Sequence, residues 1–218
     1  MVLMTNQEIL DTTFSDDSSR LPTIRQIREV VQLDDPNFWG DTIETFRFRE
    51  KYIRNSFPIL TDDFLSFAVD ILNDYRVVEL ACGPGWLTYW LRRYGLEVER
   101  AVDDLSWNAD GHSTELRYQD WVERGDAVEC VRQDPFGLFV MSWPYMDSLA
   151  AKVWKSMRRG SVMLYIGEGH GGCTADDEFH ELIHLGEVLE SETEILEENF
   201  VSFWGVHDRP LLVRKTKV

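Results

Sequence analysis

The feature that most limits the fold of this chain is the stretch VVELACGPGWLTYWLRRYG, residues 77–95, in which a β-branched run, a glycine turn and a helix follow one another. Further strands are predicted at residues 98–104, just before Gly125, at 138–143 and at 161–169, with a helix over 146–158. Strands that alternate with helices form parallel sheets with right-handed crossovers. Residues 76–185 therefore predict an α/β domain around a mostly parallel sheet.

The first 75 residues predict a different structure, because strands and helices do not alternate there. Residues 1–20 are polar and turn-forming, which predicts a weakly structured lead. Helices are predicted from Pro22, from the capping-box spacing at residues 41–44 and after Thr61. In the second of these helices, apolar residues recur at helical intervals: Ile43, Phe46, Ile53 and Phe57.

The end of the chain differs again. Two strand-like runs lie around the turn at residues 205–210, which predicts an antiparallel hairpin at the end of the sheet. We therefore expect two parts, a helical N-terminal extension or cap over 1–75 and a sheet domain over 76–218. The extension is expected to cover a ligand or to shape a second pocket, with contributions from residues around Trp39, Phe46, Arg47 and Tyr52, which suit helix packing equally well.

The glycine turn lies where an α/β sheet binds nucleotide-like ligands, at the carboxyl end of a strand. Small residues at Gly83 and Gly85 let the backbone approach a ligand closely, and Asp103 ends the next predicted strand, where it can accept from both ribose hydroxyls. A dinucleotide fingerprint requires a third glycine where this chain has Thr88. An ordinary strand-to-helix turn would use the same glycines. The prediction of a nucleotide-like ligand therefore depends on the spacing between the glycine turn and Asp103.

The stretch VVELACGPGWLT, followed by AVDD and GDA, resembles the class I S-adenosylmethionine-dependent methyltransferases over residues 76 to about 170. The resemblance implies a Rossmann-like fold and S-adenosylmethionine as cofactor. Carried over by position, it implies Glu79 near the methionine amino group and Gly83 and Gly85 under the cofactor. It also implies Asp103 on the ribose and Asp126 near the adenine amine. The chain departs from the family at Ala81, where glycine is usual, and Asp104 competes with Asp103 for the ribose role.

The fourth predicted strand ends in Ser142-Trp143-Pro144-Tyr145, which resembles the [Asp/Asn/Ser]-Pro-Pro-[Tyr/Phe] motif of amino-directed methyltransferases, with Trp143 in place of the first proline. In such a site the side-chain oxygen accepts from the target N–H and the aromatic ring stacks on a planar substrate. The resemblance gives these roles to Ser142 and Tyr145. A strand end with a buried tryptophan and a helix-entering proline would have the same four residues.

The glycine-rich loop after the fifth predicted strand is the candidate substrate loop. Glu168 and His170 there can orient an amine or accept its proton, and the turn residues His207 and Asp208 can reach the same rim. A flexible connector, and local preferences of turns for Asp, account for these residues as well. Four potential zinc ligands lie in and after the loop, at spacings that match no known motif, so no metal is predicted: His170, Cys173, His180 and His184.

The charge of the chain limits its partners. Its 39 Asp and Glu residues exceed its 22 Lys and Arg residues, for a formal net charge of −17, and residues 160–208 contain no Lys or Arg. Such a field repels phosphate backbones, which argues against nucleic acid and favours a neutral or cationic substrate. An acidic face that only keeps the protein in solution explains most of these carboxylates equally well.

The cysteine count and the N-terminal residues limit the compartment. Three scattered cysteines form no disulfide framework. The first residues lack the basic start and apolar run of a signal peptide, and no 18 apolar residues run together. We therefore expect a cytoplasmic protein without membrane association.

These patterns together predict a methyltransferase that uses S-adenosylmethionine, directed to nitrogen on a small molecule or a protein. Two alternatives stay open. The first is transfer of another part of the cofactor, such as an aminopropyl group, to an amine. The second is a non-catalytic module that binds or senses the cofactor or engages a partner protein. The sequence makes no prediction about the oligomeric state.

Overall fold

A computed structural model describes residues 4–31, 42–106, 118–133 and 137–216. Its centre is a seven-stranded sheet in the order β3-β2-β1-β4-β5-β7-β6. All pairings from β3 to β5 are parallel, and β7 is antiparallel to both β5 and β6. The strands are β1 (Val77–Leu80), β2 (Val98–Asp103), β3 (Glu123–Arg124), β4 (Leu138–Ser142), β5 (Val162–Gly167), β6 (Glu187–Val188) and β7 (Arg209–Arg214). The predicted α/β class, with a mostly parallel sheet and an antiparallel end, is confirmed.

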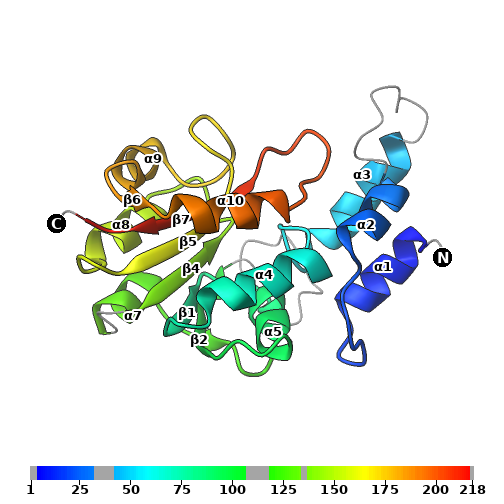
Figure 1. Ribbon diagram of the computed structural model, residues 1–218, viewed down its shortest axis with the longest axis horizontal. Helices are drawn as coiled ribbons and strands as arrows, with labels where there is room; N and C mark the ends of the chain where they lie inside the picture. Colours follow the sequence, from blue (N-terminus) through cyan, green and yellow to red (C-terminus); the bar gives the residue numbers. More distant parts are fainter. Residues whose placement is uncertain (1–3, 32–41, 107–117, 134–136, 217–218) are drawn as a thin grey trace.

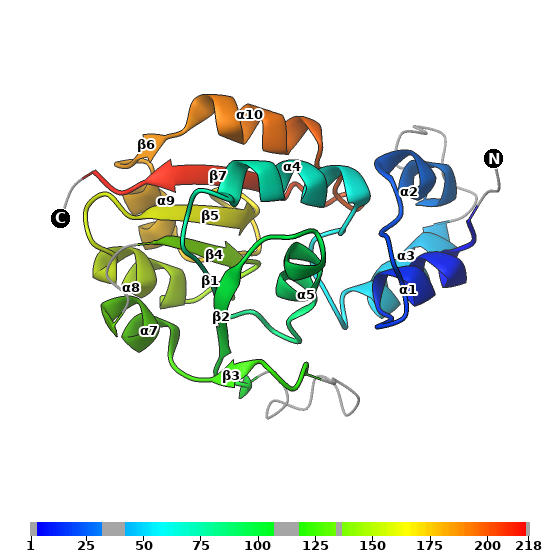
Figure 2. The ribbon, with the colours of Figure 1, turned by 60° about the horizontal axis from the view of Figure 1, so that its bottom comes forward.

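Helices cover both faces of the sheet (Figures 1 and 2). Three of them share an apolar cluster with one face: α4 (Asp62–Leu72), α5 (Trp86–Arg93) and α10 (Glu190–Glu198). On the other face lie α7 (Ala127–Gln133), α8 (Leu149–Ser156) and α9 (Asp177–Ile183). Neighbouring strand residues point to opposite faces, so Val77 joins the first cluster and Val78 the second. This two-sided burial explains why the central strands β1, β4 and β5 are mostly apolar rather than alternating, with Glu79 of β1 as a buried exception.

Three short helices stand at one end of the sheet, away from these layers: α1 (Asn6–Thr13), α2 (Ile24–Val31) and α3 (Thr42–Tyr52) (Figure 1). They form a third apolar cluster with the loop at residues 199–208, through Phe48 and Tyr52 on α3 and Val201 and Phe203 on the loop. α4 packs against the sheet instead. We call α1–α3 and the segment at residues 53–58 the helical cap.

The cap differs from the sequence prediction in two places. The expected weakly structured lead is wrong for residues 6–13, because Thr5 caps helix α1 with a capping box in which its hydroxyl accepts from the Glu8 amide at 3.2 Å. Ile9 of that helix is fully buried. Residues 14–20 form turns and bends, as expected. On α3 the predicted apolar positions Ile43 and Phe46 are 68% and 50% exposed. The buried face of α3 carries Phe48 and Tyr52, so the periodic pattern was assigned to the wrong side.

Two further predictions need correction near the end of the chain. The first run of the expected hairpin is not a strand but helix α10 followed by a loop, and β7 instead pairs with β5 on one side and with β6, which lies before that helix, on the other. Helix α9 is capped by Asp176, whose carboxylate accepts from the Phe179 amide at 2.9 Å. The capping-box spacing at residues 174–177 predicts Thr174 as the cap, but its hydroxyl bonds to Tyr165 and Glu168 instead.

A buried lysine closes the α8 side of the sheet. Lys215 is 4% exposed, and its Nζ donates to the carbonyls of Trp154, Lys155 and Met157 at 2.7–2.9 Å. These are the last carbonyls of α8, which lack partners within the helix and favour a cation. None of the helices in the described ranges has the length and apolar character that a membrane crossing requires.

Gly85 fixes how closely the turn after β1 approaches the segment before β3. Its φ is +90°, and a Cβ there would lie 2.8 Å from Val122 Cγ2 and 3.0 Å from the Trp121 ring. Gly95 has a similar φ of +100°, but a Cβ there would meet nothing within 4 Å. A comparison of substitutions at these two glycines therefore distinguishes the cost of backbone strain from the cost of disturbing a close contact.

We expect Gly95→Ala to lower the free energy of unfolding by about 1 kcal/mol, the cost of a left-handed alanine. Gly85→Ala should cost about 1–3 kcal/mol more, because a methyl group is also forced into a packed contact. Urea unfolding of both variants measures the difference. Equal losses would show that the approach of Trp121 and Val122 does not require glycine.

Candidate functional site

A cavity of about 560 Å³ opens at the carboxyl ends of β1, β2 and β4. In a doubly wound sheet this is the edge that binds ligands, at the point where the strand order reverses between β1 and β4. The cavity is lined by the turns after these strands, by the start of α7 and by the helical cap. Seven of the predicted site residues line it: Glu79, Ala81, Gly83, Asp103, Asp126, Ser142 and Tyr145.

Glu79 lies at the floor of the cavity, near the end of β1, and is 1% exposed. Its Oε2 accepts from the backbone amide of Thr88 at 3.1 Å and from the Thr88 hydroxyl. Burial raises the pKa of Glu79 to about 7, although the bonds from Thr88 act in the opposite direction. Because Oε1 has no hydrogen bond within the described residues, Glu79 is a buried acceptor whose charge a cation would stabilise.

Asp103, at the end of β2, fixes the turn after β1. Its Oδ2 accepts from the amide of Gly83 at 2.8 Å and its Oδ1 from the amide of Leu105 at 2.7 Å. The side chain is 8% exposed, and burial raises its pKa while the two amide bonds lower it. Each carboxylate oxygen still has a free lone-pair site, so Asp103 can accept from a ligand's hydroxyls.

The neighbouring carboxylates are less enclosed. Asp104 also lines the cavity, but it is exposed and its Oδ1 accepts from the Ser106 amide at 2.8 Å. Asp126 lies just before α7, where its Oδ1 accepts from the Glu129 amide at 2.9 Å. Its other oxygen makes no hydrogen bond in the part of the chain that the structure describes. Asp126 thus combines a helix-capping role with a free acceptor at the cavity.

Gly83 and Gly85 have different surroundings. Gly83 lines the cavity with φ +55°, and a Cβ there would meet no atom within 4 Å. Gly85 is packed against Trp121 and is not part of the lining. Of the two predicted glycines, the structure brings only Gly83 to the cavity surface.

Non-glycine residues in the left-handed region follow three of the strands at this edge. They are Ala81 after β1, Leu105 after β2 and Trp143 after β4, with φ between +50° and +62°. Such conformations cost about 1–3 kcal/mol each and persist where the surrounding structure enforces them. At Ala81, where the sequence resemblance leads one to expect glycine, the turn keeps a glycine-like conformation.

The Ser142–Tyr145 turn forms the far wall of the cavity. Ser142 Oγ is buried and has no hydrogen-bond partner among the described residues. The ring of Trp143 stacks on that of Phe57, with centroids 5.0 Å apart and planes inclined by 16°. Tyr145 is 43% exposed at the rim. A buried hydroxyl without a partner is costly, so Ser142 is a candidate for contact with a ligand group.

The helical cap supplies the opposite wall. Residues 53–58 line the cavity together with Arg49, and Phe57 is the cap residue that stacks on Trp143. The cap residues expected at the acceptor side do not line it: Phe46 and Arg47 are exposed and Tyr52 is buried in the cap. Trp39 lies outside the described residues. The sequence prediction thus pointed to this part of the chain, but other residues of it line the cavity.

The glycine-rich loop contributes Cys173 to the lining, but not Glu168 or His170. The Glu168 carboxylate accepts from the amides of Cys173 at 2.7 Å and His207 at 3.1 Å. Burial raises the pKa of Glu168, yet these donors outweigh it and lower the pKa overall. His170 is exposed and lies 3.4 Å from the carboxylate of Asp177. Glu168 therefore connects two loops, and His170 lies outside the cavity.

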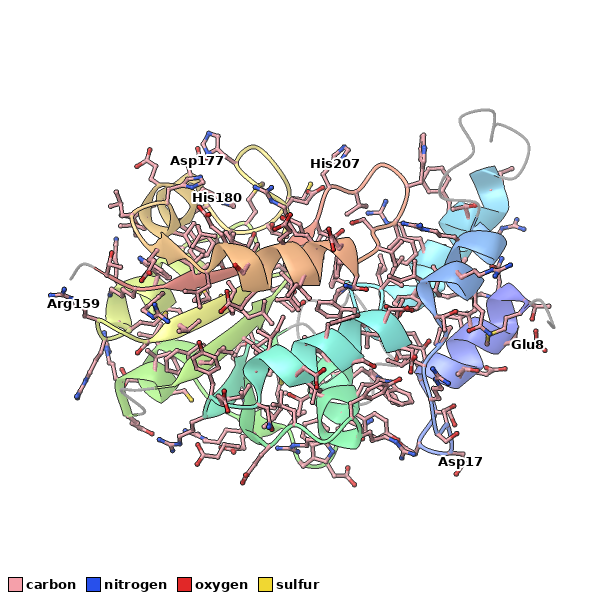
Figure 3. All side chains as sticks on the ribbon, in the orientation of Figure 1. Glu8, Asp17, Arg159, Asp177, His180 and His207 are labelled. Carbon is pink, nitrogen blue, oxygen red and sulfur yellow. The ribbon has the colours of Figure 1, made fainter. Side chains whose placement is uncertain are left out.

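The candidate zinc ligands are not gathered at one point of the described structure. No group of three or more His, Cys, Asp and Glu side chains in the described ranges is arranged to hold a metal ion. His180 lies on α9, where its Nε2 bonds to the carbonyl of Thr174 at 3.0 Å (Figure 3). His207 projects outward from the loop before β7 (Figure 3).

Two residues near the cavity had no signal in the sequence. Tyr118, before β3, has a buried hydroxyl with no hydrogen-bond partner among the described residues. It lies within electrostatic range of Asp103, Cys82 and Tyr145, and burial raises its pKa above the ordinary value. Phe57 continues the apolar pattern of the predicted helix, and such a pattern indicates helix packing rather than a ligand site. Neither belongs to a motif, because long-range contacts alone bring them to the site.

Comparison with known proteins found no matching family model and no matching curated protein. Among solved structures, the chain is similar to TehB from Haemophilus influenzae, at 15% identity and TM-score 0.45 over 77% of this chain and 67% of that one. It is also similar to an O-methyltransferase from Bacillus cereus in complex with SAH, at 14% identity and TM-score 0.42 over 88% and 96%. A SAM-dependent methyltransferase from Archaeoglobus fulgidus shares 14% identity and TM-score 0.43 over 83% and 100%. Such similarity is too distant to assign a function.

The buried carboxyl of Glu79 predicts a pH-dependent stability. A carboxyl whose pKa rises from 4.5 to about 7 on folding stabilises the fold fully only below pH 4.5, and this contribution is lost as the pH rises through 7. It amounts to roughly 3 kcal/mol. We therefore expect the stability of the wild type relative to Glu79→Gln to fall by about that amount between pH 4.5 and 8. Urea unfolding measures it, and a constant difference would contradict the account.

Proposed function

We propose that this chain is a methyltransferase that uses S-adenosylmethionine and directs the methyl group to nitrogen on a small molecule or a protein. The observation that carries the proposal is the Asp103 carboxylate. It is buried at the end of β2, held by the Gly83 and Leu105 amides, and still faces a cavity large enough for a nucleoside. A carboxylate with free lone pairs at this edge suits the adjacent hydroxyls of a ribose.

The other parts of the cofactor would contact residues at the same edge of the sheet. Glu79 would bind the ammonium of the methionine part, because its buried carboxyl gains a charge partner there. Gly83 leaves room for the ligand above the turn, and the free oxygen of Asp126 would accept from the adenine amine. The bound cofactor supplies a methyl group on a cationic sulfur, which needs alignment and exclusion of water more than a strong base.

The acceptor would lie between the Ser142–Tyr145 turn and the cap. Ser142 Oγ, without a partner among the described residues, would accept from the acceptor N–H and so aim its lone pair at the methyl group. Tyr145 at the rim would contact the face of a planar acceptor. Glu168 would act indirectly, since it holds Cys173 at the cavity, and His170 is left without a role by its distance from the lining.

One prediction concerns the cofactor site. We expect Asp103→Ala to weaken the binding of S-adenosylmethionine more than tenfold, because a charged hydrogen bond of about 1.5–3 kcal/mol is lost. Asp104→Ala is the comparison, since that exposed neighbour could hold the ribose instead. Titration calorimetry on folded samples of both variants gives the affinities. An unchanged affinity in Asp103→Ala would remove this residue from the site.

A second prediction concerns the reaction. Purified protein incubated with methyl-labelled S-adenosylmethionine and a cell extract should transfer label to an amine-containing product. Ser142→Ala should lower the initial rate about tenfold, the effect of about 1.4 kcal/mol in the barrier. Ser66→Ala on the outer surface of α4 is the matched control. Product mass separates methyl from aminopropyl transfer, and cofactor binding without any product would favour the non-catalytic module.

A further inference from the structure

Asp208 is a buried carboxylate that the proposed reaction does not use. It lies at the end of the loop at residues 199–208, is 6% exposed, and is not part of the cavity lining. Its Oδ2 accepts from the indole Nε1 of Trp143 at 2.8 Å. Its Oδ1 is buried and has no hydrogen-bond partner among the described residues. A buried carboxylate with an unfilled acceptor site is a poor device for stability alone.

The loop itself is held in place near Asp208. Its backbone carbonyl accepts from the Ser202 hydroxyl at 2.8 Å, which closes the loop on itself. The preceding residue, His207, donates its amide to the carboxylate of Glu168. Val201, Phe203 and other loop residues pack into the cap cluster. Asp208 is therefore presented to Trp143 from a fixed backbone.

Trp143 needs such support because its backbone does not favour its position. Its φ is +50°, a conformation that a bulky side chain rarely adopts. Its amide donates to the carbonyl of Ile166 at 2.7 Å, which holds the backbone but not the orientation of the ring. The ring packs against the cap cluster and stacks on Phe57, and the indole bond to Asp208 is its one side-chain hydrogen bond among the described residues.

Trp143 and Phe57 both line the cavity, whereas Asp208 lies behind them. We name this stacked pair the Phe57–Trp143 wall. It joins the end of β4 to the helical cap at the place where the acceptor would enter. If the indole rotated, the stack with Phe57 would be lost and the flat surface beside Ser142 would change shape.

We propose that Asp208 is a positioning residue, which fixes the indole of Trp143 so that the Phe57–Trp143 wall presents a flat aromatic surface to a planar acceptor. This inference rests on the proposed function for the identity of the ligand, but not for the contact itself. Asp208 acts through Trp143 and should affect the acceptor rather than the cofactor.

The contact can be tested without a ligand. In protein labelled with ¹⁵N, the indole N–H signal of Trp143 is assigned by its loss in Trp143→Phe. We expect its hydrogen exchange to be at least tenfold faster in Asp208→Ala, because the acceptor is lost. In Asp208→Asn it should stay within about threefold of the wild type, since the amide oxygen can replace Oδ2. Arg209→Ala, at a surface ion pair with Glu197, is the matched control.

The functional consequence is measured on the same variants. Affinity for S-adenosylhomocysteine should be unchanged in all of them. In the labelled transfer assay, Asp208→Ala should lose at least tenfold in rate when the acceptor extract is dilute and recover as it is concentrated, while Asp208→Asn should retain most of the rate. A merely structural role would lower the rate equally at every acceptor concentration.

The outcomes are distinct. Unchanged indole exchange in Asp208→Ala, or a rate loss that is independent of acceptor concentration, would overturn the positioning role. Failure of Asp208→Asn to restore slow exchange in a folded protein would also overturn it. If the wild type binds neither S-adenosylmethionine nor S-adenosylhomocysteine, the proposed function fails, while the exchange experiment still decides whether Asp208 fixes Trp143.

Discussion

The carboxylate of Asp103 joins two neighbouring strands at the edge where the site forms. One oxygen takes the amide of Gly83 in the turn after β1, and the other takes the amide of Leu105 beyond β2. These bonds hold the glycine turn open above the sheet and keep the carboxylate at the cavity surface. Without them, the turn after β1 would lose the bond that ties Gly83 to the end of β2.

The rigid part of the site depends on two-sided burial of the sheet. Side chains of β1 and β4 alternate between the cluster under α4, α5 and α10 and the cluster under α7, α8 and α9. The carboxyl ends of these strands are thereby fixed relative to one another. The other wall depends on a separate cluster, in which the helical cap packs on the loop that carries Asp208. The two walls of the cavity are thus supported by different parts of the core.

Local patterns in the sequence predicted most of the sheet domain. The strand at Val77–Leu80, the glycine turn and the cap residue Thr61 are short-range features, and the structure has them where they were expected. The errors arise where tertiary packing decides between local alternatives. Residues 190–198 contain only two apolar side chains, the adjacent Ile195 and Leu196, so no periodicity distinguishes a strand from a helix there. Leu196 packs into the same cluster as Leu212 of β7, and the segment forms α10. At Thr5 the capping box was present in the sequence but was outweighed by the polar composition after it.

The residues of the candidate site fall into the same two groups, those placed by local sequence features and those placed by tertiary packing. Glu79, Asp103 and Ser142 end strands or follow them, so their approach to one edge follows from topology. Phe57 and Tyr118 reach the site only through contacts between distant segments, which no short motif encodes. Glu168 and His170 were expected at the cavity because their loop follows β5, but hydrogen bonds to Cys173 and His207 turn Glu168 away from the lining.

A crystal structure of the protein with S-adenosylhomocysteine tests the central claim most directly. The account predicts that both ribose hydroxyls lie within hydrogen-bond distance of the Asp103 carboxylate and that the sulfur faces Ser142. A nucleoside bound elsewhere, or a sugar that contacts neither oxygen of Asp103, would contradict it.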